Sequence, residues 1–326
     1  MKFISFSDVH ISSVNPSSRV GSYQSDIMDK ILQVGAAGKK LGVDFYLFAG
    51  DLFNLKAPMK NPHGLNRMLI EAFKSFGAPV YGTEGNHDLR HDSYQEFPDQ
   101  PISVIYASGA IKQIRDEVFK NGDLSVRIRS FPFVESPVIS EMPRCPKDTD
   151  LSICVLHIYA SPSGGMFRKN KIYKYDELCE LGDDIFVLGH YHLDHGIVEE
   201  NFGGKIVRFI NVGALSRGTL TEENIERVPK VAYVEMPKRN GIVSVVTKTI
   251  RLRVKPASEV FDLEAREREK ERSQEAEAFV ERLKMEDMGD NPLVHIESEL
   301  SALTSDKEVL EATRSYLAEA NTALNG

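Results

Sequence analysis

Short apolar runs alternate with longer amphipathic stretches along the first two-thirds of the chain. Residues 43–49 and 151–157 are apolar on both faces, as expected for strands that are covered on both sides. Two longer stretches repeat their apolar residues at helical spacing and lie between such strands. This order predicts an α/β fold whose sheet is at least partly parallel. The expected strands are Lys2–Ser7, Val43–Ala49, Pro79–Thr83, Leu151–Ile158, Asp184–Leu188 and Lys205–Asn211, and the expected helices are Gln24–Leu41 and Asn61–Phe76.

The strands that follow are expected to run antiparallel. Val231–Glu235 and Ile242–Val254 both have the composition of strands, and Asn240-Gly241 lies between them. Asn-Gly is a strong signal for the tight turn of a hairpin. A hairpin that joins parallel strands makes the sheet mixed.

The composition changes near Pro256, where charged residues become dense. We therefore divide the chain into a main domain, residues 1–257, and a C-terminal region, residues 258–326. The C-terminal region is expected to be a small α/β unit, because helical and strand-like patterns alternate in it. Its predicted elements are a helix from about Glu264 to Met288, a strand at Pro292–Glu297 and a helix at Asp306–Leu324.

Charge and composition narrow the class of protein. The 326 residues include 40 Lys and Arg against 48 Asp and Glu, and the net charge of −8 disfavours a general electrostatic grip on nucleic acid. No apolar run reaches the ~20 residues that a bilayer span needs, so no membrane association is expected. Asp8 and His10 interrupt the N-terminal segment where a signal peptide would be apolar. The three cysteines lack a paired spacing, which indicates a reducing, cytoplasmic location, the host cytoplasm if the chain comes from a phage.

Polar residues gather where five of the predicted strands end. In open α/β sheets, ligands bind outside the carboxyl ends of the strands, so these five segments are expected to converge on one crevice. Gly50, Gly85 and Gly189 permit the close turns that would aim the side chains into it. The candidate ligands are Asp8, His10, Asp51, Asn86, His157, His190 and His192.

These side chains indicate a site for two metal ions. Carboxylate, imidazole and amide groups bind borderline-to-hard divalent cations, and no thiolate is among them. Seven ligands are too many for one tetrahedral site, but they suffice for two ions that share a carboxylate. Such a pair can clamp a phosphoryl group and generate hydroxide from water. His190 and His192 lie on the same side of an extended segment, so each can serve one of two neighbouring ions.

The motifs, taken in order, resemble those of calcineurin-like metallophosphoesterases. The resemblance implies a four-layer α-β-β-α sandwich of mixed sheets. It places His87 beside the scissile phosphate as an acid or a stabiliser of the transition state, oriented by Asp88, since a carboxylate can fix an imidazole tautomer. It assigns Asp8, His10, Asp51 and His192 to one metal and Asn86, His157 and His190 to the other, with Asp51 as the bridge.

Within that superfamily the chain is most similar to SbcD-type nucleases, the partners of SMC-like coiled-coil ATPases in double-strand break repair. Asp51-Leu52-Phe53 followed by Pro58, the final Asp of Gly85-Asn86-His87-Asp88, and the region after the last strands carry the similarity. In that family a small α/β cap follows the phosphoesterase domain. The compact length resembles that of phage recombination nucleases.

That similarity implies a DNA exonuclease, with endonuclease activity in addition, that acts in repair, recombination and replication. It also implies a homodimer within a two-plus-two complex with the ATPase, which the C-terminal region would bind. Carboxylate and amide ligands without cysteine favour manganese, with magnesium or zinc as alternatives.

Basic residues near the motifs are candidates for DNA contacts. The segment from Arg168 to Tyr175 carries four cations and two tyrosines between the two histidine motifs, so we expect it to rim the cleft. Cations can neutralise a DNA backbone and tyrosines can stack on an unpaired base. A solvated loop is the equal alternative. The candidates are Arg90, Arg168, Lys169, Lys171, Lys174 and Arg217.

Two other functions remain open on the same residues. One is a phosphodiesterase that acts on cyclic or small nucleotides. The other is a metal-containing scaffold for the ATPase without catalysis, which is disfavoured because every expected ligand is present. A Ser/Thr protein phosphatase is opposed by Leu52-Phe53, where that family has Asp-Arg-Gly, and by Asp88, where it has Glu.

Overall fold

The computed structural model describes residues 1–89, 94–167, 170–264, 267–268 and 274. The chain divides into two units, Met1–Asp262 and Leu263–Gly326. In the second unit the predicted strand Pro292–Glu297 and helix Asp306–Leu324 lie outside the described residues. The predicted helix from Glu264 to Met288 is described at only four positions, all helical. The boundary at residue 257 and the α/β cap therefore stay predictions.

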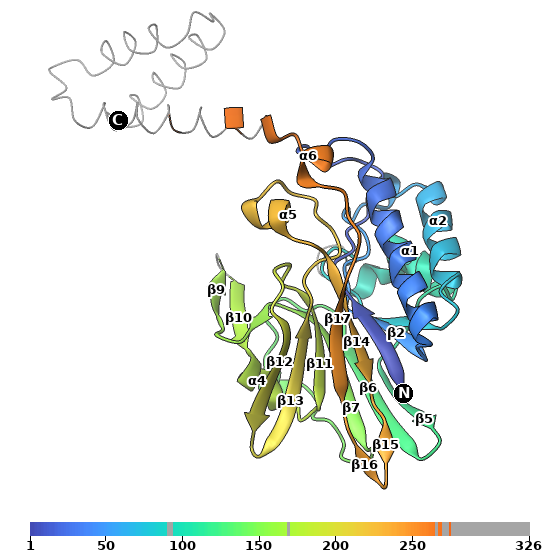
Figure 1. The fold of residues 1–326 in the computed structure, drawn as a ribbon, viewed down its shortest axis with the longest axis vertical. Helices are drawn as coiled ribbons and strands as arrows, with labels where there is room; N and C mark the ends of the chain where they lie inside the picture. Colours follow the sequence, from blue (N-terminus) through green and yellow to red (C-terminus); the bar gives the residue numbers. More distant parts are fainter. Residues whose placement is uncertain (90–93, 168–169, 265–266, 269–273, 275–326) are drawn as a thin grey trace, which may run out of the picture. The chain divides into compact units, whose positions relative to one another are not determined.

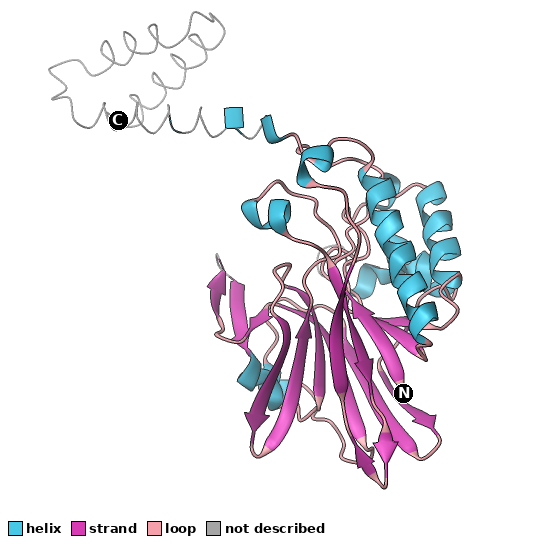
Figure 2. Ribbon diagram, viewed as in Figure 1, coloured by secondary structure: helices cyan, strands magenta, loops and turns pink. Residues whose placement is uncertain are grey.

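Two six-stranded mixed sheets form the centre of the first unit (Figure 1 and Figure 2). The first contains β1 (Lys2–Phe6), β2 (Phe45–Phe48), β3 (Val80–Gly82), β4 (Lys112–Gln113), β14 (Lys230–Glu235) and β17 (Val246–Arg251). The second contains β5 (Asp116–Asn121), β6 (Leu124–Phe131), β7 (Leu151–Ile158), β11 (Ile185–His190), β12 (Gly196–Phe202) and β13 (Lys205–Asn211). Each sheet has four parallel strands and two more that are joined by antiparallel pairing, so the predicted mixed character is confirmed.

Helices and two small sheets complete the unit. The helices are α1 (Tyr23–Leu41), α2 (His63–Lys74), α3 (Pro101–Ala107), α4 (Tyr175–Cys179), α5 (Glu222–Glu226) and α6 (Ala257–Val260), with 3₁₀ turns at Pro58–Lys60, Tyr94–Asp99 and Ile139–Glu141. The small sheets consist of β8 (Ala160–Ser161), β9 (Gly165–Phe167) and β10 (Asn170–Lys174), and of β15 (Lys238–Arg239) and β16 (Ile242–Val243). None of the described helices is both long and apolar enough to cross a membrane.

Alternation along the strands divides the core into layers. In β2, Phe45 and Leu47 join the cluster between the two sheets, whereas Tyr46 packs with α1 and α2. In β7, Val155 lies between the sheets and Leu156 packs on the outer side with residues of α4. Because a strand turns successive side chains to opposite faces, each sheet is covered on both sides. The order helices, sheet, sheet, helix confirms the predicted sandwich.

The end signals of α1 are readable in its sequence. The Ser22 side chain accepts a hydrogen bond from the Ser25 N–H and so caps the first turn. Gly42 ends the helix in a left-handed conformation, with φ of 60°. Both ends of the helix are therefore set by local signals in the sequence.

The predicted strands and helices of the first two-thirds are present near their expected bounds. A single strand at Ile242–Val254 is wrong, because β16 and β17 are separate. β16 pairs with β15 around the Asn240-Gly241 turn, whereas β17 pairs with β14. The hairpin itself is confirmed. β5, β6 and β12 were not predicted, and the exposed, charged β5 explains why its apolar pattern is faint.

Candidate metal centre

The predicted ligands come together at the carboxyl ends of β1, β2, β3, β7 and β11. Two groups have ligand atoms that all lie within 4.8 Å of one another. Asp51 belongs to both groups, and the Asn86 Oδ1 lies 3.0 Å from His157 Nε2. The first group is Asp8, His10, Asp51 and His192, and the second is Asp51, His157 and His190.

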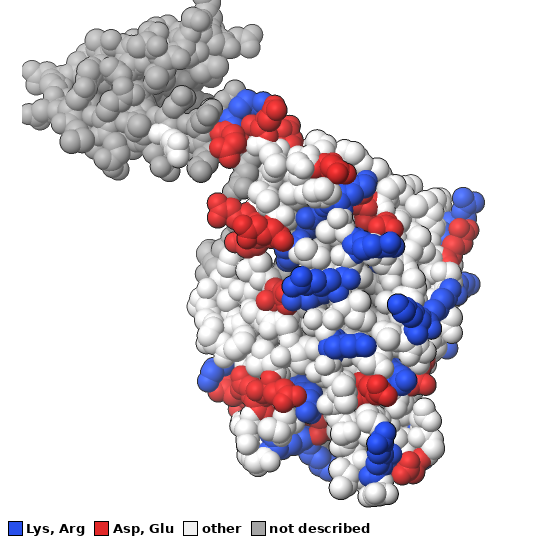
Figure 3. Space-filling view, in the orientation of Figure 1, with Lys and Arg blue, Asp and Glu red and all other residues white. Residues whose placement is uncertain are grey.

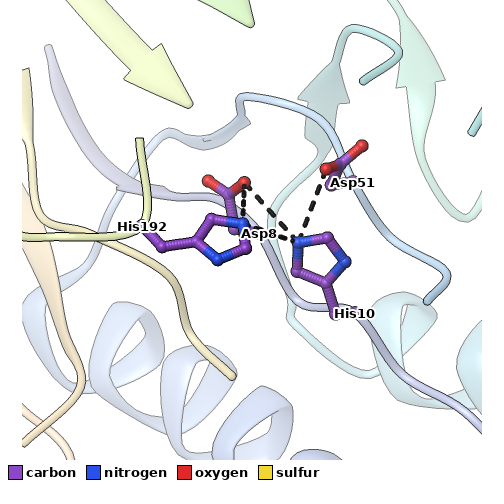
Figure 4. Close-up of side chains that lie close together, drawn as sticks. All are labelled: Asp8, His10, Asp51 and His192. Carbon is purple, nitrogen blue, oxygen red and sulfur yellow. Dashed lines mark hydrogen bonds and ion pairs between the residues drawn. The ribbon is translucent and has the colours of Figure 1, made fainter. Parts of the chain in front are cut away.

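In the first group, side chains from three loops face a common centre (Figure 4). The His10 Nε2 lies 3.4 Å from Asp51 Oδ2 and 3.0 Å from His192 Nε2. The His192 Nε2 in turn lies 3.4 Å from Asp8 Oδ1. Asp8, His10 and Asp51 are buried, but the His192 side chain is 52% exposed. The group therefore opens to solvent on the His192 side.

In the second group, a backbone carbonyl group orients the His157 ring. Its Nδ1 lies 2.7 Å from the Ala49 carbonyl oxygen, which can only accept, so Nδ1 carries the proton. Its Nε2 then faces Asp51 Oδ2 at 3.3 Å and His190 Nδ1 at 3.2 Å. A backbone carbonyl thus fixes the tautomer that leaves Nε2 free to bind a cation.

The backbone at the site is strained. Six non-glycine residues in the described part of the chain have positive φ, and four of them are predicted ligands: Asp8, His10, Asp51 and His190. Such conformations cost roughly 1–3 kcal/mol each and persist where the surroundings impose them. Any side chain at Gly85 would collide with the Asp51 carboxylate, so this close approach requires glycine. The fold holds the ligands in place at an energetic cost.

The carboxylates are held in their charged form. Burial would raise the pKa of Asp51, but His157 and His10 hold it well below its usual value. Burial likewise opposes ionisation of Asp8, and hydrogen bonds with His10 and His192 outweigh it and lower its pKa. Both carboxylates therefore carry negative charge at neutral pH, as metal ligands must.

The imidazoles differ from one another. Burial, with the repulsion of His157, lowers the pKa of His190 to about 3. Burial also acts to lower the pKa of His157, but the attraction of Asp51 raises it to about 9. His190 is therefore ready to bind a cation, whereas His157 has to release a proton when one binds.

The donor set fits divalent cations. The Asp51 Oδ2 is buried and has no hydrogen-bond partner, although it faces both His10 and His157. A buried acceptor without a partner is costly unless something else satisfies it. Imidazole ligands suit zinc, and carboxylate and amide oxygens suit manganese and magnesium, so the residues present would fit divalent cations in two groups that share Asp51.

His87 and Asp88 are placed differently from expectation. The His87 Nδ1 lies 2.8 Å from the Asn54 carbonyl oxygen. The Asp88 carboxylate instead accepts hydrogen bonds from backbone N–H groups, those of Asp51, Leu52, Phe53 and Gly85. The prediction that Asp88 orients His87 is therefore wrong, because its oxygens are used to hold the two loops together. Asp88 is a positioning residue.

A pocket of about 150 Å³ lies beside the second group. Aromatic and basic side chains line it, among them Phe133, Tyr159, Lys171 and Lys56, together with the ligands Asn86 and His190. The Phe133 ring centroid lies 5.3 Å, and that of Tyr159 3.8 Å, from the His190 ring. Sequence reasoning missed Phe133 and Tyr159. Tyr159 follows the His157 strand directly, which is a signal that could have found it.

The predicted DNA contacts have mixed outcomes. Lys171 lines the pocket beside the ligands but also forms an ion pair with Glu177. Lys174 is exposed and its ammonium lies 2.6 Å from the Asp176 carboxylate. Arg90, Arg168 and Lys169 lie outside the described residues.

The prediction for Arg217 is wrong. Its side chain is only 4% exposed, and its guanidinium donates a hydrogen bond of 2.6 Å to the Lys255 carbonyl oxygen. It lines a separate pocket that includes none of the predicted ligands. Its position after the Asn211-Val212-Gly213 turn gave no sign of this burial.

A comparison with protein families agrees with the sandwich and the site. The family model described as calcineurin-like phosphoesterase matches residues 1–194. A 5'-nucleotidase precursor from Thermus thermophilus is similar in structure at 14% identity and a TM-score of 0.46, over 85% of this chain. This chain spans 59% of that protein. TT1561 of Thermus thermophilus is similar at 11% identity and a TM-score of 0.43, over 77% of this chain and 99% of its own. No curated protein matches the sequence.

Proposed function

Since the chain belongs to the calcineurin-like phosphoesterase family and is thus a hydrolase acting on phosphoester bonds, we propose that its substrate is DNA and its metal manganese. In this proposal it cleaves phosphodiester bonds as an exonuclease, with endonuclease activity in addition. The observation that carries the proposal is the shared Asp51 between two ligand groups, with an aromatic and basic pocket beside them. The nuclease motifs at Asp51-Leu52-Phe53 and at Asp88 support the choice of DNA.

The ligand groups assign a role to each side chain. Asp8, His10 and His192 would hold one ion, and Asn86, His157 and His190 the other, with Asp51 between them. When bound, two divalent cations neutralise charge on the phosphoryl oxygens and lower the pKa of water. In each of their ion pairs the two buried carboxylates face histidine side chains, so none of the described lysines and arginines takes the place of a cation there.

His87 would supply the proton for the leaving oxygen. Its ring lies edge-on to the His10 ring, with centroids 4.7 Å apart, so it borders the first ligand group. The Asn54 carbonyl accepts from Nδ1–H, which leaves Nε2 as the atom that carries the transferable proton. Its own backbone N–H donates to Asp51 Oδ1 at 2.7 Å, so the acid and the bridging carboxylate are fixed relative to each other.

The pocket beside the site suits part of a nucleotide. Phe133 and Tyr159 offer ring faces for a base, and Lys56 and Lys171 offer positive charge for a backbone phosphate. The exposed side of His192 leaves room for a longer chain to enter and leave. A strand end that stacks on these rings would present its terminal phosphodiester to the two ligand groups.

The test compares cleavage of linear, nicked and circular DNA with manganese, for the wild type and for Asp51→Asn. The matched control is Asp123→Asn, which changes an exposed carboxylate far from the ligands in the sequence. We expect cleavage of linear DNA by the wild type and the control, and none by Asp51→Asn. Equal cleavage by Asp51→Asn, or no cleavage of any DNA by the wild type, would contradict the proposal.

A phosphodiesterase of cyclic or small nucleotides is the second candidate. The pocket of about 150 Å³ favours it, since one base and its sugar would occupy most of such a space. Turnover of cyclic nucleotides and of linear DNA by the same preparation separates the two functions. Faster turnover per site on cyclic nucleotides would favour this candidate.

We also propose the partner that the nuclease resemblance implies, an SMC-like coiled-coil ATPase in a two-plus-two complex with a homodimer of this chain. The net charge of −8 supports reliance on a partner for much of the grip on DNA. A chain truncated before Asp306 should no longer co-purify with the ATPase. Unchanged co-purification would place the binding segment elsewhere.

A further inference from the structure

A second pocket, of about 240 Å³, lies where α1, the segment after β17 and α6 meet. Figure 3 shows Lys and Arg side chains gathered on the face that carries these elements. We call it the cationic pocket, because five basic residues line it against two acidic ones. The basic residues are Arg19, Lys30, Arg217, Arg253 and Lys255, and the acidic ones are Asp26 and Asp29.

Three of the basic side chains are buried, which is unusual for charged groups. Arg19 is 6%, Lys30 4% and Arg217 4% exposed. Removing such groups from water costs free energy unless an opposite charge compensates. They also repel one another: burial, and then Arg217 and Arg19, lower the pKa of Lys30 to about 7. The fold thus holds these basic groups close together at a cost in free energy.

Compensation within the protein is incomplete. Asp26 is shared, since it lies 2.5 Å from the Arg19 guanidinium and 2.8 Å from the Lys255 ammonium. Among the described residues, Lys30 and Arg217 form no ion pair and donate instead to the carbonyl oxygens of Leu215 and Lys255. The Nε atoms of Arg19 and Arg217 are buried and have no hydrogen-bond partner.

We infer that the cationic pocket binds a phosphoryl dianion. Guanidinium groups match the geometry of phosphate oxygens, and two of them with an ammonium group favour a doubly charged ligand over a singly charged one. Bound there, the ligand would compensate Lys30 and Arg217, with which Asp26 forms no direct ion pair. Free phosphate and the terminal phosphate of a small nucleotide share this chemistry.

The cationic pocket is linked to the metal centre by one short segment. The Lys30 ammonium lies 3.1 Å from the Leu215 carbonyl oxygen, and the Leu215 N–H donates to the Ser7 carbonyl at 3.0 Å. The next residue, Ser216, donates from its N–H to the Asp8 carbonyl at 3.2 Å. A ligand that draws Lys30 toward itself would therefore act on the loop that carries Asp8.

The experiment measures binding of inorganic phosphate and, separately, of AMP by calorimetry, in the full chain carrying Asp51→Asn. Because this variant is expected to bind no metal ions, phosphate held by such ions should not contribute to the signal. The result therefore does not depend on the proposed nuclease activity. Arg217→Gln is the main variant, and Arg253→Gln changes an exposed arginine of the same pocket and so spares the fold. Arg239→Gln is the control, an exposed arginine outside the pocket.

We expect saturable binding of phosphate, AMP or both, with affinity reduced at least tenfold by Arg217→Gln, reduced less by Arg253→Gln and unchanged in the control. Phosphate binding alone identifies the free ion, and tighter AMP binding identifies a nucleotide phosphate. Crystals soaked in selenate should show anomalous density between Arg19 and Arg217. The absence of binding, equal affinity in all variants, or selenate density only elsewhere would overturn the inference.

Discussion

At the metal centre, buried carboxylates and imidazoles face one another, whereas in the cationic pocket buried guanidinium and ammonium groups do. In both places the charges of the buried side chains are only partly balanced: negative charge remains at the metal centre, and positive charge remains in the cationic pocket. The signs are opposite, so the ligands should be cations in one and an anion in the other. The comparison teaches that an incompletely paired buried charge indicates a ligand, and that its sign indicates which kind.

The supporting structure differs as well. The metal centre is built on strained backbone, with positive φ at Asp8, His10, Asp51 and His190, whereas no residue lining the cationic pocket has positive φ. Strain fixes atoms in one geometry, which chemistry at a phosphorus atom requires. Binding of an ion by long basic side chains tolerates more adjustment. The first cluster is therefore suited to a reaction and the second to binding.

The largest effect should follow from Asp51→Asn. The variant removes a charge that both ligand groups use, so we expect loss of metal binding at both positions and of phosphodiester hydrolysis. Phosphate binding at the cationic pocket should persist. Mass spectrometry checks the loss of metal, and a phosphate titration of the same preparation checks that the cationic pocket still binds phosphate. Loss of metal binding and phosphate binding together would show that the metal centre and the cationic pocket do not bind their ligands independently.

His87→Asn should reduce kcat while both metals stay bound. Removing a general acid typically costs about 10²- to 10⁴-fold. His87 is not a member of either ligand group, so the metal content should match that of the wild type. His63→Asn, at the exposed start of α2, is the matched control. A His87→Asn protein that loses metal would show that this imidazole is a ligand.

Asp88→Asn should lower the metal affinity of the site although no ligand side chain is changed. The Asp88 carboxylate accepts hydrogen bonds from backbone N–H groups of the loop that carries Asp51 and of Gly85. Amide replacement removes one acceptor oxygen, and changes to groups that support ligands typically cost about 10- to 100-fold in metal affinity. Titration with manganese measures it. An unchanged manganese affinity would mean that the strained loop keeps its conformation without the hydrogen bonds to Asp88.

Lys30→Met should change how the stability of the protein depends on pH. The pKa of Lys30 in the folded protein is about 7, below the 10.5 of an ordinary lysine. Between these values the unfolded chain holds a proton that the folded chain lacks, so stability rises with pH, by up to about 1.4 kcal/mol per pH unit. Relative to the variant, the wild type should gain stability from pH 7 to pH 10 in phosphate-free buffer. Parallel denaturation curves would contradict the pKa assigned to Lys30.

The convergence of the candidate ligands could be predicted from the sequence because these residues follow strands in short motifs. A strand such as β7 is recognisable from its apolar run, and the position of His157 within it follows from counting. What holds the ligands could not be predicted, because the Ala49 and Asn54 carbonyls are backbone groups that any residue has. Asp88 was misjudged for the same reason, since its partners are backbone N–H groups of a distant loop.

The cationic pocket shows the opposite case. Arg19, Lys30 and Arg217 come from distant parts of the chain and belong to no motif, so tertiary packing is what brings them together. Arg217 was predicted to contact DNA, which requires an exposed side chain such as most arginines have. Charges buried by tertiary packing leave no local pattern in the sequence.

The most direct test of the two-ion site is a crystal structure of the full chain soaked in manganese, with anomalous diffraction recorded at the manganese edge. The account predicts two peaks about 3.5–4 Å apart, with a carboxylate oxygen of Asp51 bonded to both. A single peak, or two peaks of which either lacks Asp51 as a ligand, would contradict it.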